Sequence, residues 1–207
     1  MGESGKMKGL NRIFIWFSNL AYLNLLWVVF TLFGFIILGV APSTSALFAV
    51  IRKLLQNEGK VSITKTYYEY FRRDFWKINR VFYVLLLVGF IIFVDIYFLY
   101  GLKNTLATLF LYLLMVLSII YFVTCLFIFP VFVHYDLKML ENIKQAFLMG
   151  MTKPLYILGI VVSLVVSYVV LIYLKTLFIF FGISLGAFII MSACYHMFIQ
   201  MKLNTGK

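Results

Sequence analysis

The chain has 207 residues, of which 64% are hydrophobic and only 12% are charged. Soluble domains carry about 25% charged residues, and a globule of this length still exposes much of its surface, so the composition excludes a soluble fold. A net charge of +11 would favour nucleic-acid binding on a soluble protein. Here the basic residues lie between apolar runs, which favours contact with anionic lipid headgroups and indicates no nucleic-acid partner.

Five apolar runs have roughly the 20 residues needed to cross the hydrocarbon core of a bilayer: 20–40, 81–100, 106–129, 155–174 and 177–199. Inside a bilayer such runs must be helices, because no water is available for unpaired backbone groups. The first helix could begin earlier, near Ile13. The sequence therefore predicts an all-α integral membrane protein in which residues 1–207 form one compact bundle.

The connections refine this arrangement. Two of them, 101–105 and 175–176, are short enough to predict antiparallel helical hairpins. The three prolines are expected to lie outside the spans, where they remove no helical hydrogen bond. Pro42 follows the first run, Pro130 follows the third, and Pro154 precedes the fourth.

The long connections are amphipathic. Apolar residues follow helical spacing in residues 43–58, 63–80 and 140–151, with basic residues around them. Such helices are expected to lie in the membrane interface on the cytoplasmic side. The competing arrangement folds them over the ends of the bundle, and periodicity does not separate the two.

The distribution of basic residues predicts the orientation. With five spans, thirteen of the eighteen lysine and arginine residues fall on the side of the long connections and the carboxyl terminus. The positive-inside rule places that side in the cytoplasm of a plasma-membrane protein and the amino terminus outside. Three basic residues before the first span oppose this orientation.

Residues 63–129 and 137–199 have the same order of basic helix, span, short turn and span. This order indicates a parallel internal repeat. A chance similarity, which any chain with paired spans can show, remains equally open.

Two of the polar residues inside the predicted spans, Asn24 and Asp95, are candidate site residues. Asp95 is the only acidic residue in a span, where an unpaired charge is costly, so it is a functional candidate. The favoured interpretation is nevertheless structural: an ion pair with Lys103 or Lys175 at the outer turns, or a position at the membrane interface. Asn24 is expected to bond a neighbouring helix, with substrate binding as the alternative.

The remaining titratable residues indicate little chemistry. His134 and Asp136 lie near one predicted helix end, and Cys194 and His196 near another, but their spacing matches no zinc motif. Interfacial hydrogen bonding explains them better than a metal does. No nucleophile–base pattern, phosphate loop or paired-carboxylate motif is present. We therefore expect a protein that is not an enzyme and holds no metal and no cofactor.

Small residues recur every four positions in the last predicted hairpin. They are Gly159, Ser163 and Ser167 in the fourth span, and Gly182 and Gly186 in the fifth. Such stripes let helices approach closely. Packing within this chain is the favoured interpretation, and docking against a partner or a second copy is the alternative.

Aromatic and basic residues alternate in 67–77. Between two membrane spans, aromatic side chains gather at the headgroup level and cations bind lipid phosphates. The residues predicted to contact headgroups are Arg72, Arg73, Trp76 and Lys77.

A distinctive pattern lies in residues 21–53. An Asn-Leu-Leu-Trp helix around Asn24 precedes a Gly-x-x-Pro-x-Thr turn from Gly39 to Thr44, and an Ala-Leu-Phe helix follows. The pattern resembles the YesL-like integral membrane proteins of Gram-positive bacteria, a family of unknown function. Ser43 stands where alanine is expected. The resemblance implies an accessory role in carbohydrate uptake, and it carries over no catalytic residue.

The sequence thus favours an accessory or assembly protein of the lipid bilayer, linked to oligosaccharide uptake and associated with a sugar ABC-transporter permease. A small oligomeric transporter or channel is the alternative, because Asp95 and Asn24 are polar groups within spans. A membrane enzyme is least favoured, because convergent polar groups are missing.

Overall fold

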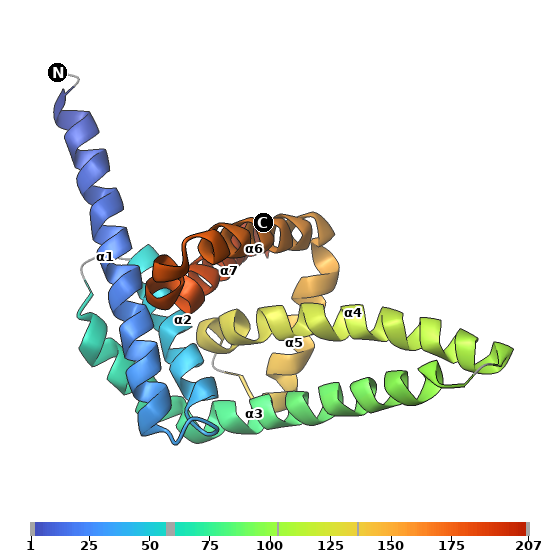
Figure 1. Ribbon diagram of the computed structural model, residues 1–207. Coiled ribbons are helices and arrows are strands. Elements are labelled where there is room, and N and C mark those ends of the chain that lie inside the picture. The colour runs from blue at the N-terminus through green and yellow to red at the C-terminus, as the bar shows by residue number, and fades with distance from the viewer. Residues whose placement is uncertain (1–2, 57–60, 103, 136, 206–207) are drawn as a thin grey trace.

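The computed structural model describes residues 3–56, 61–102, 104–135 and 137–205, and these form seven helices (Figure 1). In chain order the helices are α1 Glu3–Phe33, α2 Val40–Gln56, α3 Ile63–Tyr100, α4 Thr105–His134, α5 Met139–Thr152, α6 Pro154–Tyr173 and α7 Lys175–Thr205. Five of them are long and apolar enough to cross a membrane: α1, α3, α4, α6 and α7. The predicted all-α class with five membrane-spanning helices is confirmed.

The first span lies earlier than predicted. Its apolar segment begins at Ile13, as the alternative start suggested, but α1 ends at Phe33 instead of continuing to residue 40. A turn over residues 34–39 then reverses the chain, and Phe35 and Ile36 have left-handed backbone conformations with φ of 57°. Apolar composition is the same in the helix and in the turn, so it could not mark where the helix stops.

Helix α2 is the most buried element, not a helix on the interface. Eleven of its seventeen residues are buried, among them Leu47, Ile51 and Leu54. It packs against α1, α3, α4 and α7, and Phe48 stacks on Phe129 of α4 with ring centroids 5.8 Å apart. An apolar face of this kind is buried equally well by lipid or by other helices, and here the helices cover it.

The segment 63–80 and the second predicted span form one continuous helix, α3. Its 38 residues extend about 57 Å at 1.5 Å per residue, while the hydrocarbon core is about 30 Å thick. The second unit of the suggested repeat differs, because Pro154 begins α6 immediately after the break at Lys153 that ends α5. Each unit of the suggested repeat therefore contains two spans, but the helices of the two units begin and end at different places.

Two prolines lie inside helices. Pro130 lies inside a span, contrary to its predicted position, whereas Pro42 lies in α2, which is not one of the five candidate spans, and so agrees with the prediction. Pro130 is within α4, which continues to His134. The Pro130 ring removes one backbone hydrogen bond of α4. Pro130 is buried against neighbouring helices, and this packing stabilises a proline inside a helix. Pro42 is the third residue of α2, where a helical N–H bond is not required.

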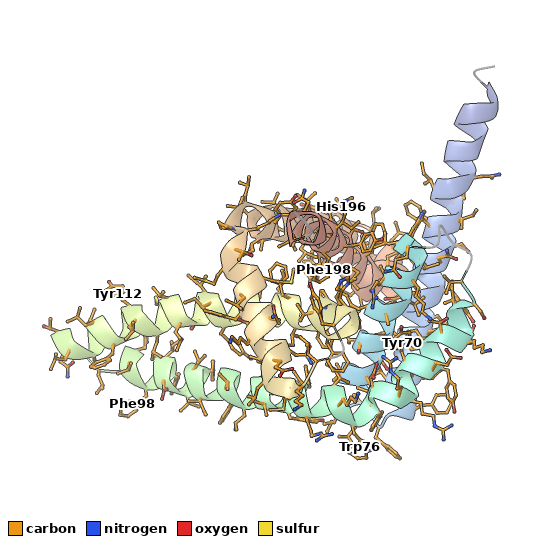
Figure 2. All side chains as sticks on the ribbon, turned by 180° about the vertical axis from the view of Figure 1, so that it is seen from behind. Tyr70, Trp76, Phe98, Tyr112, His196 and Phe198 are labelled. Carbon is orange, nitrogen blue, oxygen red and sulfur yellow. The ribbon has the colours of Figure 1, made fainter. Side chains whose placement is uncertain are left out.

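The hairpin of α3 and α4 extends well beyond the other helices (Figure 1). Near its tip, Phe98 and Tyr112 point outward (Figure 2). The arrangement is more open than the compact bundle expected from chain length. Lipid tails surround apolar side chains as favourably as other helices do, so no hydrophobic force closes such a hairpin onto its neighbours.

Candidate functional site

Asn24 joins α1 to α7 through the α7 backbone. Its Nδ2 donates to the carbonyl oxygen of Ile179 at 2.7 Å, and its Oδ1 accepts from the N–H groups of Ile183 and Ser184, each at 3.2 Å. The side chain is only 5% exposed. Its amide is engaged with the chain itself, which is the interhelical role expected, and not aimed into a substrate cavity.

The family-like pattern builds the corner between α1 and α2. The indole N–H of Trp27 donates to Thr44 Oγ1 at 3.0 Å, and Thr44 donates to the carbonyl of Val40 at 2.7 Å. A Cβ on Gly39 would lie 2.3 Å from the carbonyl oxygen of Thr31. Only glycine fits at this close approach, so the pattern encodes backbone packing.

Helix α3 holds the same corner from the other side. Asn79 Nδ2 donates to the carbonyl of Leu38 at 3.0 Å, and the Tyr83 hydroxyl donates to that of Ile37 at 2.9 Å. The fully buried Tyr67 donates to the carbonyl of Ser43 at 2.8 Å. Sequence reasoning missed these three residues as bonding groups, although all lie on or beside the apolar stripe of α3.

The small residues of the last hairpin do not pack in a single way. In α7, a Cβ on Gly186 would meet Leu164 of α6 at 3.6 Å, which is ordinary contact within the hairpin. A Cβ on Gly159 would meet nothing within 4 Å, and Ser163 is exposed beside it. The favoured interpretation of internal packing therefore describes Gly186, while the Gly159 end of the stripe faces open space.

Two hollows follow this stripe. One, of about 510 Å³, lies between α6 and α7 and is lined by Gly159 and Ser163 together with Phe188 and Ser192. We call it the α6–α7 groove. The other, of about 330 Å³, is lined by Ser167, Gly182 and Gly186 among apolar residues. The Ser192 hydroxyl is buried and has no hydrogen-bond partner in the described part of the chain.

Asp95 lies on α3 in the α3–α4 hairpin, at a hollow formed by both helices. It is exposed and lines a hollow of about 310 Å³ with Leu99 and Leu113. Among the described residues no ion pair reaches it, so the suggested pair with Lys175 is not formed. The other suggested partner, Lys103, lies outside the described residues.

The four predicted headgroup residues are all exposed: Arg72, Arg73, Trp76 and Lys77. Arg73, whose side chain is 60% exposed, also pairs with Asp74 through two hydrogen bonds of 2.9 and 2.8 Å. Asp74 is 2% exposed, and sequence reasoning missed it. Its signal was its position on the stripe that also carries Tyr67, Ile78 and Val81, because a carboxylate there must be buried.

The histidine and cysteine residues form no metal centre in the described ranges, where no three such ligands come together. The His134 ring stacks on Phe198 with centroids 3.8 Å apart, Cys194 is fully buried, and His196 is exposed. Asp136 lies outside the described residues. Burial raises the pKa of the neighbouring Tyr135 hydroxyl above its usual value.

Comparison with known proteins assigns the family. The family model described as a protein of unknown function, DUF624, matches residues 20–96, which include the α1–α2 corner. YteU of Bacillus subtilis is 30% identical over 207 residues, covering 100% of this chain and 93% of the relative. YesL of the same organism is 26% identical, covering 93% and 91%. Both are described as uncharacterized proteins. No solved structure matches. The chain thus belongs to the YesL-like DUF624 family of proteins of unknown function.

Proposed function

We propose that this protein is a non-catalytic accessory component of a membrane assembly for oligosaccharide uptake, and that it binds a transporter permease through the α6–α7 groove. The groove is the observation that supports the proposal. Its Gly159 backbone is open to close approach, and the buried Ser192 hydroxyl lacks a partner. Small residues and single hydroxyls are the groups through which membrane helices associate. The carbohydrate link rests on the resemblance in residues 21–53.

Co-purification in mild detergent tests the groove. Gly159→Phe fills the open face and is expected to abolish recovery of a permease from the native membrane. Leu158→Phe is the matched control, because Leu158 is 63% exposed on the same helix and does not line the groove. Recovery that is equal for both variants, or no permease recovered with the unaltered chain, contradicts the proposal.

Growth of a deletion strain across a panel of oligosaccharides tests the carbohydrate link. We expect slow uptake of at least one oligosaccharide, restored by the Leu158→Phe gene and not by the Gly159→Phe gene. Unchanged growth and uptake on every sugar would contradict the link to carbohydrate uptake. The proposed docking of a permease would then be judged by the co-purification experiment alone.

We also propose that the protein lies in the bacterial plasma membrane with its carboxyl terminus in the cytoplasm. The excess of lysine and arginine on that side supports this orientation. A reporter fused after Lys207 is expected to be active only as a cytoplasmic reporter. Activity of an extracytoplasmic reporter at the same place would reverse the orientation.

A small oligomeric transporter is the second candidate, and the position of Asp95 favours it. The carboxylate lies in an apolar hollow of the hairpin with no described partner, and such groups mark ion and substrate paths. In proteoliposomes Asp95→Asn is then expected to abolish solute flux. Flux equal to that of the unaltered protein would reject Asp95 as a transport residue.

A further inference from the structure

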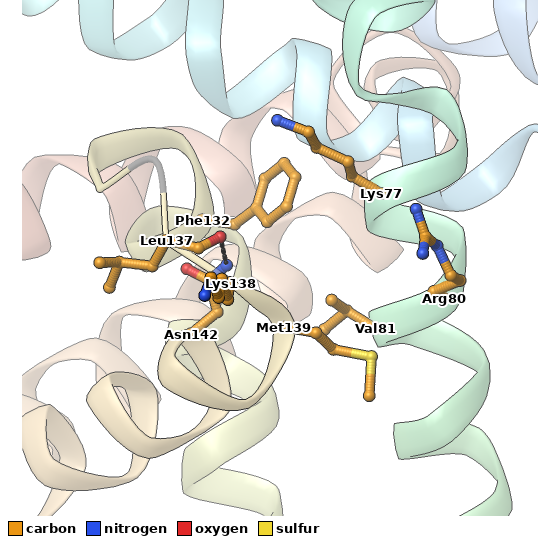
Figure 3. A pocket seen from close by; sticks show the side chains of 8 residues that line it. All are labelled: Lys77, Arg80, Val81, Phe132, Leu137, Lys138, Met139 and Asn142. Atoms are coloured by element: carbon orange, nitrogen blue, oxygen red, sulfur yellow. Dashed lines mark hydrogen bonds between the residues drawn. The ribbon is translucent and has the colours of Figure 1, made fainter.

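A cavity with basic and apolar lining lies between α3 and the α4–α5 corner (Figure 3). Its volume is about 420 Å³. Val81, Phe132 and Met139 give it an apolar wall, and Lys77, Arg80 and Lys138 line it with cations. Arg80 and Lys138 come from segments far apart in the sequence, so only the fold brings them to one cavity.

The cavity lies where the basic part of α3 meets its apolar span. Arg80 is the last basic residue of α3, and the buried Val81 follows it directly. This boundary is the depth of lipid phosphates in a bilayer. A ligand here can place an anion on the cations and an apolar part against Val81 and Phe132.

The amino end of α5 adds to the positive potential. Lys138 is the cap residue of this 14-residue helix, and helix amino ends attract anions. Glu141 on the first turn accepts a hydrogen bond from the Lys138 N–H at 3.3 Å and does not line the cavity. The lining therefore carries three cations and no described carboxylate.

Asn142 supplies an unused acceptor. It is 1% exposed and lines the cavity, and its Nδ2 donates to the carbonyl of Leu137 at 3.0 Å (Figure 3). Its Oδ1 is buried and has no partner in the described part of the chain. An acceptor beside cations cannot bind the phosphate oxygens themselves, so it fits a hydroxyl donor on the same ligand.

We infer that this cavity binds a phosphate group that carries a neighbouring hydroxyl, with Arg80 and Lys138 holding the phosphate and Asn142 accepting from the hydroxyl. The headgroup of phosphatidylglycerol and free glycerol 3-phosphate both have this chemistry. The apolar wall of the cavity, and its position at the level of the lipid phosphates, favour the lipid. The site uses other helices than the α6–α7 groove, so neither inference depends on the other.

Thermal unfolding of the full chain in detergent tests the ligand without any substitution. Phosphatidylglycerol is expected to raise the Tm more than phosphatidylmethanol, which has the same charge and no hydroxyl, and phosphatidylcholine is expected to raise it least. Equal shifts for all three lipids overturn the site. If glycerol 3-phosphate alone produces the shift, the site stands and its ligand is soluble.

Paired variants test the residues. Arg80→Gln with Lys138→Gln is expected to raise the half-saturating phosphatidylglycerol concentration at least tenfold. Arg72→Gln with Lys144→Gln removes the same charge from exposed positions of α3 and α5 outside the cavity, and is expected to change it less than twofold. An equal loss in the two pairs would mean general surface attraction and would overturn the site.

Discussion

The Asn24 side chain of α1 binds two groups of α7 that a regular α-helix pairs with each other: the carbonyl of Ile179, at 2.7 Å, and the N–H of Ile183, at 3.2 Å. One amide therefore sets where the first helix meets the last. Apolar packing alone specifies such a contact weakly in a membrane, because lipid competes with every apolar side chain.

Asn24→Leu is expected to lower the free energy of unfolding by about 1 kcal/mol, the scale of interhelical hydrogen bonds in membranes. The loss stays moderate because Ile179 and Ile183 can still pair within α7. Unfolding in mixed micelles by SDS measures it. Thr31→Val is the control on the same helix, since the buried Thr31 hydroxyl has no described partner, and we expect no loss. Equal stabilities of the two variants would deny the amide any role.

Gly39→Ala is expected to destabilise the protein by about 2 kcal/mol, because the new Cβ would lie 2.3 Å from the Thr31 carbonyl oxygen and the α1–α2 corner must move. Gly159→Ala is the matched change in open space and is expected to stabilise α6 by about 0.5–1 kcal/mol. Thermal unfolding in detergent compares them. If Gly39→Ala caused no loss of stability, the α1–α2 corner would not be closely packed.

Tyr67→Phe removes the buried hydroxyl that donates to the Ser43 carbonyl. We expect a loss of about 1–2 kcal/mol, because that carbonyl then lacks its side-chain donor inside the core. Tyr68→Phe, one residue away and half exposed, is expected to stay within about 0.5 kcal/mol of the unaltered chain. Chemical unfolding of both variants is the measurement, and a similar loss in each would place the effect outside this bond.

Asn104 caps α4, and its Oδ1 accepts a hydrogen bond from the Ala107 N–H at 2.7 Å. The Asn104→Ala substitution removes this cap. The expected cost is about 1 kcal/mol. Asn104→Asp keeps an acceptor at the same place and is expected to retain most of the stability. Hydrogen exchange of the first turn of α4 reports the difference, and equal protection in the two variants would reject the cap.

The residue pattern anticipated some parts of the site and not others. Asn24 was predicted to bond between helices because an amide in a span must find a partner. Asp74 was missed although it lies on the buried stripe of α3, because residue spacing does not show that its carboxylate accepts two hydrogen bonds from Arg73. The basic cavity was also beyond reach, since Arg80 and Lys138 are 58 positions apart and meet through the α3–α4 hairpin.

By itself the sequence determined that the chain is all-α and has five apolar helices, because apolar length and backbone hydrogen bonding leave no other choice in a bilayer. The tertiary structure alone decided that α1 stops at Phe33, that α2 is buried inside, and that Gly159 faces open space while Gly186 does not. The physical reason is that lipid and protein satisfy an apolar side chain equally. Composition shows which residues leave water, and only close contacts between helices show which of them meet each other.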